Sequence, residues 1–98
     1  METRVLILGC SGDEQLKMKH ILSYCSLNFV GAIDILLSEI KATTYQAILL
    51  YNRDKQLKET VLAIKSHSTS PIIAIGPEIG QKQLMQCIRE GLNDYILF

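Results

Sequence analysis

The chain has 98 residues, of which 48% are hydrophobic and 20% are charged, so it is large enough for one globular domain and lies outside the disordered class. Ten basic and ten acidic residues cancel, which leaves no net field to attract nucleic acid or an anionic membrane. No apolar run approaches the ~20 residues that cross a bilayer. The three cysteines include no CxxC pair, which favours a reduced setting. We therefore expect one cytoplasmic domain at 1–98 that contacts neither nucleic acid nor membrane directly.

The first half of the chain alternates short apolar runs with segments of helical spacing. Residues 4–8 predict a buried strand, and Ser11 with Glu14 three positions later is a capping box that predicts the start of a helix. The apolar stripe of that helix is Met18, Ile21, Leu22 and Cys25. Residues 29–33 predict the second strand, and Asp34 is expected to cap the next helix. The inward residues of this second helix are Leu36, Leu37 and Ile40.

The central strand is predicted from the uninterrupted apolar run of residues 47–50. A short run without alternation is typical of a strand that is buried on both faces of a parallel sheet. The run ends at Tyr51 and Asn52, with no acidic residue at its last positions. Because α/β folds build their sites where strands end, these two side chains are expected to lie at the site.

The second half predicts two more helices and two more strands. Asp54 is placed to cap a helix whose inward residues are Leu57, Val61 and Ile64. Residues 72–75 predict a fourth strand, and residues 81–90 a fourth helix that Gly91 ends in a left-handed conformation. The inward residues of this fourth helix are Leu84, Met85 and Ile88. Residues 95–98 predict a fifth strand.

Four β-α units and a last strand, written (βα)4β, predict one parallel sheet with helices on both faces. Strand order 2-1-3-4-5 places the topological switch between the first and third strands, where ligands of such folds bind. The residues expected to face that crevice are Gly9, Cys10, Ser11, Tyr51 and Asn52, with Gly76 and Pro77 beside them.

The segment PIIAIGPE…REGLNDYILF resembles the end of the receiver domain of bacterial response regulators, which has a Pro-led strand, a helix and a Gly-x-x-Asp-Tyr turn into the fifth strand. RVLIL and YQAILLY are similar to the first and third strands of that family. The resemblance spans nearly the whole chain. It implies a flavodoxin-like three-layer sandwich, a module of two-component phosphorelay signalling, and a domain truncated before its fifth helix, since no residue follows Phe98.

The resemblance also places the phosphorylation residues of receivers on unsuitable side chains. The pair of acids that bind Mg²⁺ falls on Gly9 and Cys10, and the phosphate-accepting aspartate falls on Tyr51. The hydroxyl residue of the switch falls on Gly76, and the lysine falls on Phe98. A phosphoryl acceptor needs a carboxylate beside a carboxylate-bound Mg²⁺. We therefore expect a pseudo-receiver with no catalytic residue, no metal and no cofactor, which is not an enzyme.

Two alternatives keep some chemistry in the crevice. Asp13, Glu14 and Asp54 could form a shifted cation site, although acids are favoured in the first turn of a helix in any case. Tyr51 could replace the switch of a receiver in function, or it could plug the vacant acidic pocket with its ring packed and its hydroxyl wet.

Cys10 carries the alternative function. It lies between a strand and a helix N-terminus, a position that lowers a thiol pKa and favours anions. This arrangement is similar to that of the IIB subunits of sugar phosphotransferase systems, which carry phosphate on cysteine. Asp13 and Glu14 oppose it, because they put negative charge where a phosphate would need donors, and an inert Cys10 is the plainer interpretation. The other two cysteines, Cys25 and Cys87, are expected in the core.

A missing fifth helix predicts an apolar opening on one sheet face near the fourth and fifth strands, which a partner subunit or the rest of a longer protein would cover. The alternative is that residues 95–98 fray and the sheet has four strands. We expect protein contact, as a homodimer, with another protein or with a downstream effector domain. The predicted contact surface comprises Leu84, Ile88, Leu92, Tyr95, Leu97 and Phe98.

Overall fold

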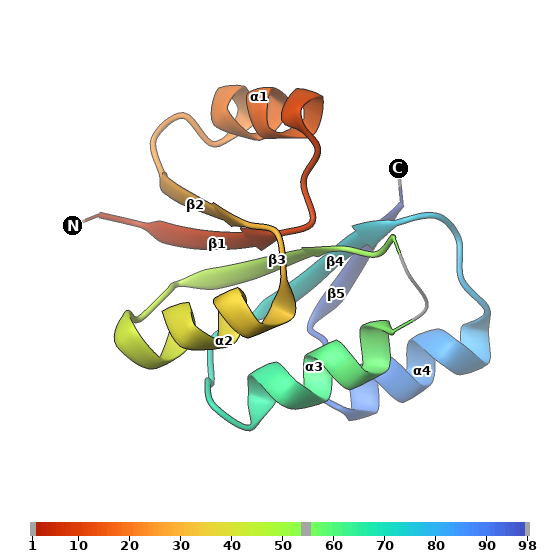
Figure 1. The fold of residues 1–98 in the computed structure, drawn as a ribbon. Helices are drawn as coiled ribbons and strands as arrows, with labels where there is room; N and C mark the ends of the chain where they lie inside the picture. The colour runs from red at the N-terminus through yellow and green to blue at the C-terminus, as the bar shows by residue number, and fades with distance from the viewer. Residues whose placement is uncertain (1, 54–55, 98) are drawn as a thin grey trace.

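The structure, a computed structural model, describes residues 2–53 and 56–97. Within them, five parallel strands lie in the order β2-β1-β3-β4-β5, with helices on both faces (Figure 1). The strands are β1 (Arg4–Leu8), β2 (Ser26–Val30), β3 (Ala47–Tyr51), β4 (Ile72–Gly76) and β5 (Asp94–Leu97). The helices are α1 (Gly12–Ile21), α2 (Ile33–Ala42), α3 (Leu57–Lys65) and α4 (Gln81–Arg89). The predicted (βα)4β topology and strand order are confirmed.

Strand β3 lies at the centre of the sheet because its apolar run pairs on both sides. Leu49 is in register with Ile7 of β1 and with Ile73 of β4. Ile48, Leu49 and Leu50 are all buried, as an uninterrupted apolar run predicts for a central parallel strand. Its last residue, Tyr51, therefore reaches the edge of the sheet between β1 and β4.

The sheet face under α2, α3 and α4 holds the main hydrophobic core (Figure 1). Alternate strand positions and the inward stripes of the three helices supply its buried members. They are Leu6, Leu36, Tyr45, Ile48, Leu50, Leu57, Val61, Ile64, Ile72, Ala74, Cys87 and Leu92. The inward stripes predicted for the second and third helices are confirmed, because Leu37 and Ile40 also pack against this cluster.

Helix α1 covers the opposite face by itself among the described helices (Figure 1). A smaller buried cluster lies there, formed by Val5, Ile7 and Leu49, and Met18 and Leu22 pack against it. Toward β5 this face opens to solvent. Ile96 pairs in register with Ile75, so it shares that face, and it is exposed.

Two predicted helix stripes are partly wrong. Ile21 at the end of α1 is exposed, and Cys25 lies beyond that helix, where it packs against the smaller cluster. On α4, Met85 and Ile88 are 47% and 46% exposed, whereas Cys87 is buried. Helix α4 carries two neighbouring apolar stripes about 100° apart, and the one that contains Leu84 and Cys87 faces the core.

The predicted second strand is wrong by three residues. Strand β2 begins at Ser26, and α2 follows an N-cap at Ala32, so Asp34 lies in the first turn of the helix and does not cap it. The amide nitrogen of Asn28 donates to Glu39 and to the hydroxyl of Tyr45, both at 2.9 Å. These partners hold a polar side chain within the edge strand, where its sequence alone suggests a turn.

Two predicted helix ends agree with the structure. The capping box is present, because the Ser11 hydroxyl accepts from the Glu14 N–H and the Glu14 carboxylate accepts from the Ser11 N–H. Gly91 follows α4 with a φ of +119°, the left-handed conformation expected there.

Strand β5 pairs with β4, so the four-stranded alternative is wrong. The predicted cap Asp54 lies outside the described residues. No described helix is long and apolar enough to cross a membrane.

Candidate functional site

The carboxyl ends of β1 and β3 bring Gly9, Cys10 and Tyr51 together, as predicted. Gly9 has a φ of +89°, and a Cβ at this position would lie 3.4 Å from the Cβ of Tyr51. The Cys10 thiol and the Tyr51 hydroxyl are close enough for each to shift the pKa of the other. A thiol and a phenol are therefore neighbours at the carboxyl ends of β1 and β3. Ser11, also predicted here, instead caps α1.

Both of these groups hold their protons more firmly than usual. Burial, with the neighbouring Cys10, raises the pKa of Tyr51 to about 12. Burial also raises the pKa of the Cys10 thiol, although the neighbouring Tyr51 hydroxyl and the positive charge of Arg53 oppose that rise. At neutral pH this pair supplies neither a thiolate nor a phenolate. The pKa-lowering effect expected for a cysteine before a helix is thus outweighed by desolvation.

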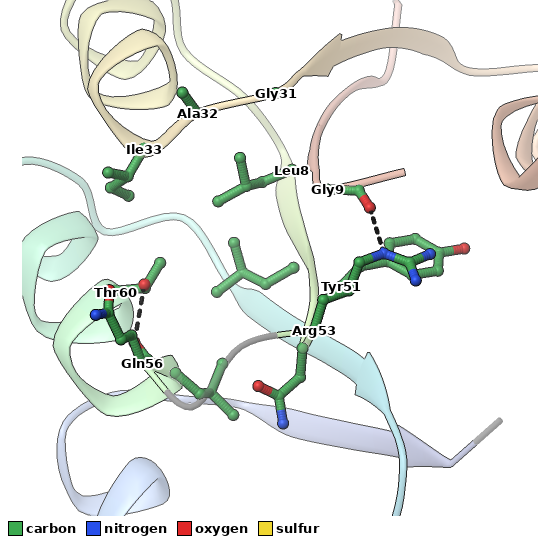
Figure 2. Close-up of a pocket in the computed structure, with 12 residues that line it drawn as sticks. Leu8, Gly9, Gly31, Ala32, Ile33, Tyr51, Arg53, Gln56 and Thr60 are labelled. Atoms are coloured by element: carbon green, nitrogen blue, oxygen red, sulfur yellow. Dashed lines mark hydrogen bonds between the residues drawn. The ribbon is translucent and has the colours of Figure 1, made fainter. Parts of the chain in front are cut away.

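Arg53 lies across this pair. Its Nε donates to the carbonyl oxygen of Gly9 at 2.8 Å, a bond drawn in Figure 2, and its guanidinium forms an ion pair with the Glu14 carboxylate. The guanidinium carbon lies 5.5 Å from the centre of the Tyr51 ring, within cation–π range. The sequence pattern does not single out Arg53. A signal exists, however, since a basic residue follows the end of the central strand where an acid is missing.

We call the carboxyl edge of the sheet its mouth. The residues at its β1–β3 half, Cys10, Glu14, Tyr51 and Arg53, do not fit the magnesium ion that the receiver resemblance implies. Mg²⁺ prefers carboxylate, carbonyl and water oxygens in octahedral geometry. Cys10 and Tyr51 offer a thiol and a protonated phenol, and the carboxylate of Glu14 is engaged by Arg53. In the described part of the chain, no group of three or more His, Cys, Asp or Glu side chains could hold a metal ion. The third member of the predicted shifted site, Asp54, lies outside that part.

The other half of the mouth, at β4 and β5, is closed by Tyr95. Its hydroxyl donates to the Pro77 carbonyl oxygen at 2.5 Å and accepts from the Asn52 amide nitrogen at 3.1 Å. A Cβ at Gly76 would lie 2.7 Å from that hydroxyl and 2.9 Å from the Cβ of Asn52. Since real Cβ atoms do not approach neighbours so closely, only glycine fits at residue 76. The space beside residue 76 is thus filled by Tyr95.

A cavity of about 300 Å³ lies beside the mouth, on the side of α2 and α3 (Figure 2). Leu8 and Ile33 point into it, and the Thr60 hydroxyl at its rim donates to the Gln56 carbonyl oxygen at 2.9 Å. The lining residues are Leu8, Gly9, Gly31, Ala32, Ile33, Leu50, Tyr51, Asn52, Arg53, Gln56, Leu57 and Thr60. Arg53 is the charged member of this lining, and its guanidinium is turned to Gly9 and Glu14.

Fewer residues of the predicted contact surface are exposed than the sequence predicts. Leu92 is only 3% exposed and belongs to the main core, because the chain turns back under α4 before β5, so its assignment to the surface is wrong. Tyr95 and Leu84 also pack against that core. Ile88 and Leu97 are exposed, the latter by 63%, and Met85 joins them from α4. Phe98 lies outside the described residues.

Comparison with known proteins places the fold. No protein-family model matches the sequence, and no curated protein matches it significantly. A two-component response regulator from Clostridium difficile is similar in structure, with a TM-score of 0.86 and 19% identity over 98% of this chain and 83% of that chain. A receiver domain protein from Methanospirillum hungatei JF-1 gives 0.83 and 17%, over 99% and 82%. A response regulator from Hahella chejuensis gives 0.82 and 19%, over 97% and 79%. The chain therefore has the fold of response-regulator receiver domains.

Proposed function

We propose that this chain is a pseudo-receiver, a signalling module with the receiver fold that acts by protein contact and without phosphorylation. Tyr51 carries the proposal. It stands at the end of the central strand, where the receiver resemblance puts the phosphate-accepting aspartate, and its hydroxyl pKa of about 12 keeps it protonated. A cytoplasmic location and the lack of an enzymatic activity belong to the same proposal.

The chemistry of phosphoryl transfer supports this assignment. The transferring oxygens need a divalent cation to neutralise their charge, and the acceptor must be an ionised or activated nucleophile. Here the nearest nucleophiles, Cys10 and Tyr51, are both neutral at physiological pH. The raised pKa of Cys10 also speaks against the phosphocysteine alternative, which requires a thiolate.

The test is incubation of the chain with acetyl phosphate and Mg²⁺, followed by intact-mass measurement. We expect no phosphoryl adduct, whereas a true receiver domain treated in parallel gains one. Tyr51→Phe and Cys10→Ser are the matched variants. An adduct that Tyr51→Phe abolishes would contradict the proposal, and an adduct that Cys10→Ser abolishes would establish the phosphocysteine alternative.

The contact part of the proposal rests on exposed apolar side chains at α4 and β5. Met85, Ile88 and Leu97 are exposed although they are large and hydrophobic. We propose that they form a surface for a second copy of the chain or for a partner protein. Sedimentation at rising concentration is expected to show self-association that Ile88→Lys weakens. A monomer at the highest concentration, for the unmodified chain, would argue against a homodimer.

A further inference from the structure

The receiver fold implies a metal site at the mouth, but the residues there do not fit a metal ion. The guanidinium of Arg53 lies among these residues. We propose that Arg53 is the resident cation of this mouth, and that its charge opposes the binding of a divalent metal ion there. This inference rests on the proposed function, and it adds that the chain supplies its own positive charge where receivers take up an ion.

The contacts of Arg53 are those of a bound cation. A carbonyl oxygen, a carboxylate and the face of an aromatic ring surround the guanidinium, contributed by Gly9, Glu14 and Tyr51. All three present negative charge or electron density to a cation. They come from three segments, the end of β1, the first turn of α1 and the end of β3, so one side chain links both loops of the mouth.

The Glu14 carboxylate is held in place to pair with the Arg53 guanidinium. Its carboxylate accepts from the Ser11 N–H at 2.8 Å in the capping box, which fixes the side chain at the mouth. Its side chain is also the less exposed partner of the pair, at 20% against 48% for Arg53. The Gly9 carbonyl and the Glu14 carboxylate are both oxygen ligands of the kind that Mg²⁺ or Mn²⁺ accepts. Arg53 contacts the Gly9 carbonyl oxygen and one oxygen of the Glu14 carboxylate, which puts its positive charge where such an ion would bind.

One carboxylate and one carbonyl are too few to hold a divalent ion, so the test adds a second carboxylate at the acceptor position. The variants are Tyr51→Asp alone and Tyr51→Asp with Arg53→Gln. Mn²⁺ binding is measured by titration calorimetry and by the loss of the free-ion paramagnetic resonance signal. We expect the double variant to bind Mn²⁺ at least about tenfold more tightly than Tyr51→Asp, because a cation a few Å from another cation is strongly repelled.

The matched control is Tyr51→Asp with Arg89→Gln. It carries the same net charge as the test variant, but Arg89 lies at the far end of α4, away from the mouth. Mn²⁺ affinity in this control is expected to equal that of Tyr51→Asp. Equal affinity in all three variants would overturn the role of Arg53, yet it would leave the unphosphorylated wild-type chain, and so the proposed function, untouched.

A second measurement serves if the double variant fails to fold. In Arg53→Ala, with Tyr51 retained, millimolar ethylguanidinium is expected to raise the melting temperature, because it can occupy the vacated cation position. Ethylammonium, which lacks the planar fork, is expected to act less, and neither should raise the melting temperature of the unmodified chain. A response to ethylguanidinium that is the same in the variant and the unmodified chain would overturn the inference.

Discussion

The two faces of the sheet differ in how completely they are covered. Among the described residues, twelve form the buried cluster under α2, α3 and α4, whereas three form the one under α1. Neighbours in a single strand show the difference: Ile72 of β4 is fully buried on the first face, and Ile73 is only partly buried on the second. The first face therefore stabilises the fold, and the second leaves apolar surface open toward β5.

Two tyrosines line the mouth of the sheet, and each belongs to a different face. Tyr95 packs against the main core, and the Pro77 carbonyl and Asn52 amide hold its hydroxyl. Tyr51 packs against the smaller cluster, as Cys10 does, and Arg53 lies over its ring. Each tyrosine fills one half of the carboxyl edge of the sheet. The chain itself therefore closes the mouth from both faces of the sheet.

The largest effect is expected from truncating the better covered face. Ile72→Ala removes a fully buried side chain from the main core, and we expect a loss of about 2–5 kcal/mol in the free energy of unfolding. Ile73→Ala, one position along β4 and on the opposite face, is expected to lose about 1 kcal/mol. Denaturant unfolding of both variants at low protein concentration measures the difference.

This pair is its own matched control, because the two substitutions change the same strand and remove the same atoms. Strand propensity therefore cancels, and the difference reports burial alone. Equal losses would contradict the difference in burial between the two faces. They would mean that the α1 side of β4 is as well covered in solution as the side of α2, α3 and α4.

The strand order, the central position of β3 and the inward faces of α2 and α3 are predictable from sequence, because uninterrupted apolar runs and helical stripes encode burial directly. The bounds of β2 are not. Asn28 sits within that strand because its partners Glu39 and Tyr45, 11 and 17 residues away, satisfy its amide. For α4, two equally apolar stripes compete, and only packing against the sheet selects the one that contains Cys87.

The site divides likewise into predictable and unpredictable parts. Gly9, Cys10 and Tyr51 meet because the carboxyl ends of neighbouring parallel strands share one edge. The ion pair of Arg53 joins residues 39 positions apart, and no local pattern records that Glu14 faces it. The bond of Asn52 to Tyr95 spans 43 positions and is equally invisible.

A smaller effect is expected at the β4–β5 half of the mouth. Gly76→Ala places a Cβ 2.7 Å from the Tyr95 hydroxyl and 2.9 Å from the Asn52 Cβ, so both neighbours must give way. We expect a loss of about 1–3 kcal/mol in the free energy of unfolding, as for other overpacked sites. Gly31→Ala is the matched control, because a Cβ there meets nothing within 4 Å, and its effect is expected to stay within about 0.5 kcal/mol.

Tyr95→Phe identifies the obstacle. It removes the hydroxyl, which is the nearest atom to the added Cβ, so Gly76→Ala should be less costly in the Tyr95→Phe background than in the unmodified chain. The penalty should not vanish, since the Asn52 Cβ remains close. A double-mutant cycle from denaturant unfolding measures this coupling. If the two losses simply add, Tyr95 does not fill the space at residue 76, and this half of the mouth is closed in some other way.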